Sequence, residues 1–115
     1  QSLANRWLKR FLTPKGSHPI RRLEGTEFPY LIGANVDSTD ALQGPITEYI
    51  EDATSQIEAV DRKSPWLTPE GRLRAATLSQ FSAVSADHID FWVELTNQAG
   101  KRLNILIPYK VQTNG

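Results

Sequence analysis

Carboxylates and two histidines are the side chains of this chain that could carry acid–base chemistry. Two carboxylates at a suitable separation could act as acid and base on a glycosidic bond, so a muralytic, lysozyme-like enzyme is one function to consider. Most of the acids, however, are spaced along the outer face of one predicted helix, where water would solvate them. The serines lie outside any nucleophile elbow, and the histidines lack the neighbours of a catalytic triad. We therefore expect no enzymatic activity.

The chain also lacks the residue patterns needed to bind a metal, to use a thiol or to cradle a phosphate. His18 and His88 are the only histidines, and neither has a second ligand at metal-binding spacing, so both are expected to be ordinary turn residues. The chain has no cysteine, which excludes a thiolate nucleophile, a disulfide and a cysteine metal site. Lys15 and Gly16 do not form a phosphate loop, because the glycine spacing is wrong and no strand leads into them. No cofactor and no metal are expected.

Charge is balanced over the whole chain but segregated along it. The 13 basic and 13 acidic residues cancel. Residues 1–23 contain six Lys or Arg and no acid, whereas residues 24–61 contain nine Asp or Glu and no base. Two interpretations are open. The blocks could make a dipolar surface on a subunit that meets different partners on different faces, or they could neutralise each other within the fold.

The segment from Ser2 to Leu12 predicts a basic amphipathic helix. Such a helix could in principle bind a membrane surface or a nucleic-acid backbone, but three positive charges are too few for either, and a solvated or partner-facing helix is favoured. No apolar run is long enough to cross a membrane, and no signal-peptide pattern opens the chain. We expect a soluble protein with neither a nucleic acid nor a membrane as its partner. The apolar stripe of the helix is Leu3, Trp7, Leu8 and Phe11.

The last third of the chain, from Glu70 to Tyr109, predicts three antiparallel strands joined by short turns. Apolar residues recur with period 2 in the second and third strands, which is typical of a sheet with one buried face. Pro108 cannot donate to a ladder, so its strand lies at an edge or ends there, and the tail 110–115 is expected to extend it. The residues predicted to face the core are Ile89, Phe91, Val93 and Leu95, then Leu103, Ile105, Ile107 and Tyr109.

A long amphipathic helix is predicted to begin at Gly44-Pro45, with proline at the first helical position. Its apolar stripe consists of Ile46, Ile50, Ala53, Ile57 and Val60. This stripe should lie across the apolar face of the sheet. The prediction is therefore a single α+β domain over residues 1–115: a small antiparallel three-stranded meander covered by an amphipathic helix, with an N-terminal helix.

Three connecting segments complete the predicted fold. In the segment 13–26, Gly25 marks a tight turn. The apolar run 28–33 should lie across the core. The segment 61–69 contains two prolines and should be extended on the surface. Trp66 within it is either a lid on the core, which we favour, or an exposed anchor for a partner.

The order of these elements resembles the baseplate wedge family of contractile-tailed bacteriophages, the W-type or gene 25-like proteins. Relatives of that family occur in tailocins and, as TssE, in type VI secretion machines. The resemblance extends from about Arg10 to Tyr109. It is carried by Lys15-Gly16-Ser17 with Gly25, by the Ile-x-x-x-Ile helix, by Glu70-Gly71-Arg72-Leu73, and by the final Leu-Asn-Ile-Leu-Ile-Pro-Tyr strand.

The hallmark of this family is a Glu-Pro-Arg motif between the acidic helix and the first strand of the sheet. The matching positions here are Glu70, Gly71 and Arg72, with glycine in place of proline, and Glu58 with Arg62 is the second candidate. The resemblance implies that Glu70 and Arg72 make charge-assisted contacts with the larger wedge subunits. Lys15 and Gly16 join them as the implied partner-binding residues.

The function implied by the resemblance is structural. Family members link the inner baseplate to the sheath and template the first sheath ring, accepting sheath arms by strand addition. The implied location is the tail baseplate of a virion, assembled in the host cytoplasm, with multiple copies, about six, in a ring. The implied partners are other wedge subunits, central hub, spike or tube-base proteins, and the sheath protein.

Overall fold

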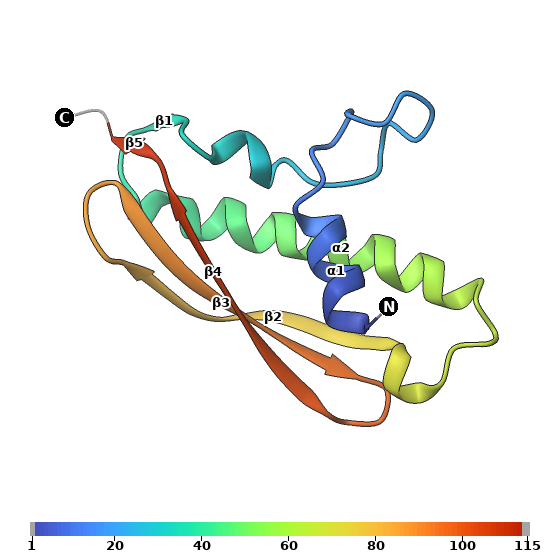
Figure 1. The fold of residues 1–115 in the computed structure, drawn as a ribbon. Coiled ribbons are helices and arrows are strands. Elements are labelled where there is room, and N and C mark those ends of the chain that lie inside the picture. The colour runs from blue at the N-terminus through green and yellow to red at the C-terminus, as the bar shows by residue number, and fades with distance from the viewer. Residues whose placement is uncertain (1, 114–115) are drawn as a thin grey trace.

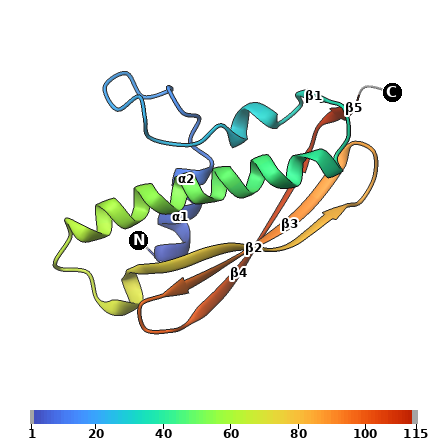
Figure 2. The same ribbon diagram turned by 180° about the vertical axis from the view of Figure 1, so that it is seen from behind.

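The computed structural model describes residues 2–113, so the predicted extension of the tail over 114–115 lies outside the described residues. The chain forms an α+β fold in which two α-helices lie on one face of a three-stranded antiparallel sheet (Figure 1). The view from behind shows the long helix running across the sheet (Figure 2). The predicted fold class and the meander order are confirmed.

The sheet consists of β2 (Leu73–Ala83), β3 (His88–Asn97) and β4 (Arg102–Lys110), in the order β2-β3-β4. The pairing of β3 with β4 runs without interruption from His88 opposite Lys110 to Thr96 opposite Arg102, whereas β2 pairs with β3 through two register shifts. The predicted core-facing residues of β3 are all buried. Leu103 of β4 is 52% exposed, because it lies beside the hairpin turn, where the first residues of α1 approach it only partly.

The two α-helices begin close to their predicted positions. Helix α1 covers Leu3–Phe11, and the Ser2 hydroxyl caps it by accepting a hydrogen bond of 3.1 Å from the Asn5 N–H. Helix α2 covers Gln43–Arg62 and follows the 3-10 turn η2 at Asp40–Leu42. Pro45 is thus the third helical residue, where its missing N–H costs no intrahelical hydrogen bond.

The core forms where the helices meet the sheet. The stripe of α2 is confirmed at four of its five positions, but Val60 is 39% exposed and the next residue, Asp61, is buried in its place. An aromatic cluster fills the space between α1 and the sheet, with ring centroids 4.6 to 6.1 Å apart. Its members are Trp7, Phe11, Phe28, Phe91 and Tyr109.

Residues 13–33 form the first part of the connection between α1 and α2. Gly25 makes the predicted tight turn with φ +97°, and Thr26 then pairs with the chain beside Pro14. In the run 28–33 only Phe28 is fully buried and Leu31 packs partly against the core, because the 3-10 helix η1 (Phe28–Leu31) turns Tyr30 to the solvent. The prediction that the whole run crosses the core is therefore wrong.

The end of the chain changes its pairing partner. After β4 the short strand β5 (Gln112–Thr113) pairs in parallel with β1 (Asn35–Val36), a second small sheet that the sequence did not predict. The prediction that the tail extends the third strand is therefore wrong for Gln112 and Thr113, which pair with β1 instead. Within residues 2–113, neither helix is long and apolar enough to cross a membrane.

Ion pairs join the basic and acidic blocks of the sequence. Four of the six bases in residues 1–23 contact acids of residues 24–61. This supports the interpretation that the blocks neutralise each other within the fold, at least for these four residues. The pairs are Arg6–Asp61, Arg10–Glu24, Lys15–Asp52 and Arg21–Glu24.

Candidate partner-binding surface

Arg72 is the residue before β2, and its side chain is bound inside its own chain. Its guanidinium donates to three backbone carbonyls: Nε to Leu67 O at 3.1 Å, Nη1 to Asp61 O at 2.6 Å and Nη2 to Ser64 O at 2.7 Å. The planar fork of arginine suits this arrangement, and the positive charge complements the carboxyl end of α2. Arg72 therefore fixes the segment 63–69 to the end of the helix.

Asp61 is the centre of a network that joins α1, α2 and β2. Its Oδ1 accepts a hydrogen bond from Arg6 Nη2, and its Oδ2 accepts one from the Leu73 N–H at 2.8 Å. Arg6 also donates to the Gly71 carbonyl at 2.8 Å. The sequence predicted residue 61 as the start of an extended surface segment, so this role of Asp61 was missed. The available signal was its spacing, since Asp61 follows Ile57 by four residues, in phase with the buried stripe.

The predicted pair Glu70 and Arg72 does not act as one unit. Arg72 points at the end of α2, whereas Glu70 is exposed on the 3-10 turn η3 (Pro69–Gly71). The second candidate pair, Glu58 and Arg62, lies near the end of α2. These two residues, together with Arg72 and Arg74, line one cavity of about 320 Å³. The structure thus places Glu58, Arg62 and Arg72 around one cavity, which the exposed Glu70 does not line.

Lys15 and Gly16 lie at the other end of α1. The Lys15 Nζ is 3.6 Å from Asp52 Oδ2, and its carbonyl accepts a hydrogen bond of 2.7 Å from the Tyr30 hydroxyl. Gly16 is exposed with φ +88°. Gly71 contacts Arg6 in the middle of α1, whereas Lys15 and Gly16 follow the end of that helix. The predicted site residues therefore form two separate surfaces.

The outer side of β4 is a regular strand edge. The Lys110 carbonyl accepts a hydrogen bond of 2.9 Å from the Gly33 N–H, so Lys110 directs its backbone groups away from β3. Backbone direction alternates along an antiparallel strand, so Arg102, Asn104 and Leu106 also point their N–H and C=O groups outward. Pro108 occupies an outward position, as the edge prediction requires. We call residues 102–108 the β4 edge.

The opposite edge of the sheet is less regular. β2 carries two register shifts, between Leu73 and Ala75 and between Leu78 and Gln80. Bulges of this kind bend an edge and discourage pairing with another strand. The β4 edge is therefore the better acceptor for an added strand.

Trp66 is 75% exposed, so the prediction that it covers the core is wrong. Arg72 holds the carbonyls of Ser64 and Leu67 on either side of it, and the segment bends outward between α2 and β2 (Figure 1). The alternative of an exposed anchor agrees with this position.

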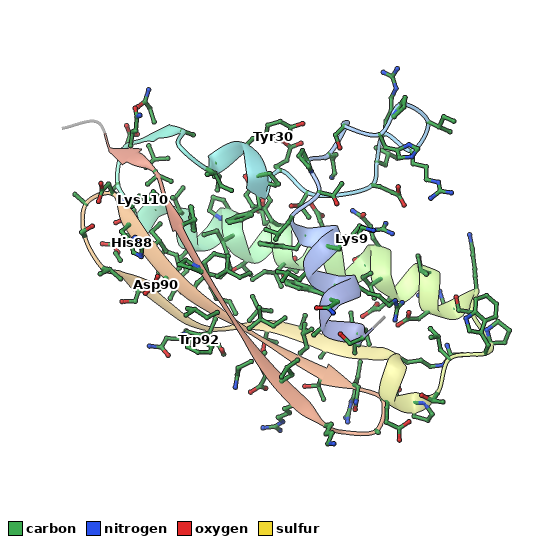
Figure 3. The ribbon with its side chains drawn as sticks, viewed as in Figure 1. Lys9, Tyr30, His88, Asp90, Trp92 and Lys110 are labelled. Atoms are coloured by element: carbon green, nitrogen blue, oxygen red, sulfur yellow. The ribbon has the colours of Figure 1, made fainter. Side chains whose placement is uncertain are left out.

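The two histidines have different surroundings. His18 lies in a turn, as predicted, and its Nδ1 accepts hydrogen bonds from the N–H groups of Ile20 and Arg21. His88 is instead the first residue of β3, and its Nε2 lies 2.9 Å from Asp90 Oδ1. Figure 3 shows His88, Asp90 and Trp92 in succession along the sheet, beside Lys110. Within residues 2–113, no group of three or more His, Cys, Asp and Glu side chains could hold a metal ion.

Comparisons of the chain with family models, with curated proteins and with solved structures gave no match. Function is therefore inferred from the surfaces described above and from the resemblance of the sequence motifs. Three features bear on it: the cavity beside Arg72, the turn at Lys15 and Gly16, and the β4 edge.

Proposed function

We propose that this protein is a structural wedge subunit of a contractile-tail baseplate and that it templates the first ring of the sheath. The observation that supports this function is the β4 edge. It presents outward-pointing backbone groups at Arg102, Asn104 and Leu106, next to a ladder with β3 that has no register shift. An extended arm of another protein can continue such a ladder by strand addition.

The β4 edge limits where an added strand could pair. Outward N–H groups are present from Arg102 to Leu106, and Pro108 has none to offer. The acceptor segment is therefore about 5 residues, or roughly 17 Å, long. Arg102 is its first residue, and Lys101 comes directly before it; charged side chains are common at edges that must avoid indiscriminate pairing.

The remaining surfaces would serve the other partners of a wedge subunit. Arg62 and Arg74 beside Glu58 line a cavity that a neighbouring wedge subunit would contact, while Arg72 holds the local backbone in place. Hub, spike or tube-base proteins would approach other faces. The alternative function, a muralytic enzyme, gains no supporting observation from the residues that the structure describes. Clearing of cell-wall suspensions by the purified protein would favour that alternative.

The test is the substitution Leu106→Pro, with Leu106→Ala as its matched control. Proline removes one outward N–H from the β4 edge and leaves the hydrogen bonds to β3 intact, whereas alanine keeps the N–H. Particles assembled with Leu106→Pro should show tubes without sheath by negative-stain microscopy. Those with Leu106→Ala should show normal contractile tails. Circular dichroism of both purified variants verifies that they fold.

Two outcomes would contradict the proposal. Normal sheathed tails with Leu106→Pro would exclude the β4 edge as the acceptor. Normal tails from cells that lack this protein altogether would exclude the structural role.

A further inference from the structure

A groove separates the loop 16–24 from the two helices. It consists of two adjoining cavities of about 410 and 390 Å³. Arg10, Arg21, Glu24 and Val60 line both of them. Figures 1 and 2 show this loop standing away from the body of the fold. We call the two cavities together the loop–helix groove.

One half of the loop–helix groove is positively charged. Its lining includes Arg6, which is neutralised by Asp61, and three further cations against the single carboxylate of Glu24. A surplus of two positive charges remains. Lys9, which projects from α1 (Figure 3), makes no ion pair within residues 2–113. This half of the groove therefore favours an anionic ligand.

The other half of the groove is apolar and open to solvent. Ile20 is 86% exposed and Leu23 is 81% exposed, and both line the second cavity together with Ala59 and Val60. Two neighbouring aliphatic side chains with such high exposure do not pack in the core, and they indicate a contact surface for a partner. A small free anion would leave them unused, so the ligand should carry apolar groups as well as negative charge.

Hydrogen bonds fix the end of the loop next to Gly25 and its interior around His18. Gln56 on α2 binds both backbone groups of Gly25, accepting from its N–H at 2.9 Å and donating to its carbonyl at 2.8 Å. Arg10 donates to the same Gln56 Oε1 at 3.1 Å. Within the loop, His18 Nδ1 accepts from two backbone N–H groups. A groove preformed in this way loses little conformational entropy when a ligand enters it.

We propose that the loop–helix groove is a docking site for an acidic, apolar-bearing peptide segment of a partner protein. Charge complementarity identifies the occupant: carboxylates would contact Lys9, Arg10 and Arg21, and apolar side chains would contact Ile20 and Leu23. This surface is distinct from the β4 edge, and the proposal does not depend on strand addition.

The test is a titration of the 15N-labelled full chain with a synthetic peptide of about 14 residues, in which Leu and Glu occupy opposite faces of a helix. The matched peptide has Gln in place of every Glu. The acidic peptide should shift the amide signals of residues 18–24 and 56–60 and should bind at least about tenfold more tightly than the Gln peptide. Added salt should weaken its binding.

A double variant, Ile20→Ser with Leu23→Ser, should bind the acidic peptide at least about tenfold more weakly. Because both side chains are exposed, the fold should remain intact. Val84→Ser is the matched control, since Val84 is also exposed but lies in the turn between β2 and β3. Its binding should equal that of the wild type. Leu106→Pro should also bind normally, which separates this proposal from the proposed function.

Four results would overturn the proposal. The first is an absence of shifts at residues 18–24 and 56–60, and the second is equal affinity for the two peptides. The third is tighter binding of a single-stranded DNA oligonucleotide than of the acidic peptide, which would make the groove a nucleic-acid site. The fourth is self-association that the double variant abolishes, which would make a second copy of this chain the occupant.

Discussion

Tyr109 places its hydroxyl in the aromatic core, where it has no hydrogen-bond partner within residues 2–113. Burial raises the pKa of this hydroxyl well above its ordinary value, and the nearby Tyr49 raises it further. A buried polar group without a partner loses its hydrogen bonds to water and forms none inside the protein. The ring contributes packing against Phe28 and Phe91, but the oxygen does not stabilise the fold.

Tyr109→Phe should raise the free energy of unfolding by about 1 kcal/mol, because it removes the unsatisfied hydroxyl and keeps the ring. Urea denaturation at pH 7 measures this change. Tyr30→Phe is the control with the opposite sign, since the Tyr30 hydroxyl donates to the Lys15 carbonyl at 2.7 Å. Lower stability of Tyr109→Phe would show that the hydroxyl has a partner.

The same residue predicts an alkaline effect on stability. The pKa of Tyr109 is higher in the folded than in the unfolded chain, so ionisation of this group does not change the stability of the fold below the unfolded pKa of about 10 and lowers it as the pH rises above that value. Tyr109→Phe should therefore lose less stability than the wild type between about pH 10 and pH 11. Equal losses would contradict this assignment.

Asp61 shows how one residue can join three elements. Asp61→Asn should lower the free energy of unfolding by about 3 kcal/mol, because it leaves the half-buried Arg6 without its counter-charge. Urea denaturation is the measurement. Asp52→Asn breaks a more exposed pair with Lys15 and should cost less than about 1 kcal/mol. Similar losses for the two variants would mean that burial does not distinguish these pairs.

The connection between the helices depends on one glycine. A Cβ at Gly25 would lie 2.1 Å from the Thr13 carbonyl oxygen, and its φ of +97° is unfavourable for other residues. Gly25→Ala should therefore cost about 3 kcal/mol or more. Gly16 has a similar φ of +88° but open space around it, so Gly16→Ala should cost only about 1 kcal/mol. Thermal unfolding of both variants would show whether steric contact or backbone conformation dominates.

Helix α2 stabilises the sheet through its buried stripe. Ile50→Asp should prevent folding at 25 °C, because a buried charge without a partner costs several kcal/mol, on the order of the total stability of a small domain. Far-UV circular dichroism of the purified variant is the measurement. Ser55→Asp, on the exposed face of the same helix, should change stability by about 0.5 kcal/mol or less. A folded Ile50→Asp would contradict the assigned packing.

The whole molecule measures 51 × 34 × 20 Å and contains one continuous core. Residues from α1, α2 and the sheet share that core, so none of these elements buries its apolar face alone. We expect a single cooperative unfolding transition. Near-UV and far-UV circular dichroism should give coincident curves in urea. Separate transitions would indicate that α1 or the loop 13–26 unfolds independently of the sheet.

Charge at this scale is distributed over distinct surfaces. The ion pairs between the two sequence blocks remove four bases from the dipolar surface that the sequence alone suggested. What remains positive is local: the loop–helix groove with Lys9. The cavity beside Arg72 has both signs of charge, with Arg62 and Arg74 near Glu58. The β4 edge is a third surface. Their separation is compatible with a subunit that binds several partners at once.

The periodic elements were predictable because their signals are local. Alternation in β3 and the spacing of Ile46, Ile50 and Ile57 depend only on the geometry of a strand and a helix, and all of these residues are buried. The candidate site was less predictable. Arg72 was singled out, but its contacts to three backbone carbonyls were not, and Asp61 was missed.

The sequence by itself determined the two helices, the three strands and the turn at Gly25, since each follows from residues near one another in the chain. For Pro108 it left open whether its strand is an edge or ends there. Only the tertiary structure decided the rest. Asp61 is buried because it pairs with Arg6, which lies 55 residues earlier in the chain. Likewise β5 pairs with β1, a strand from a distant part of the sequence. Trp66 is exposed because Arg72 holds its segment outward. Contacts between distant residues leave no periodic signal, so their outcome depends on the complete packing.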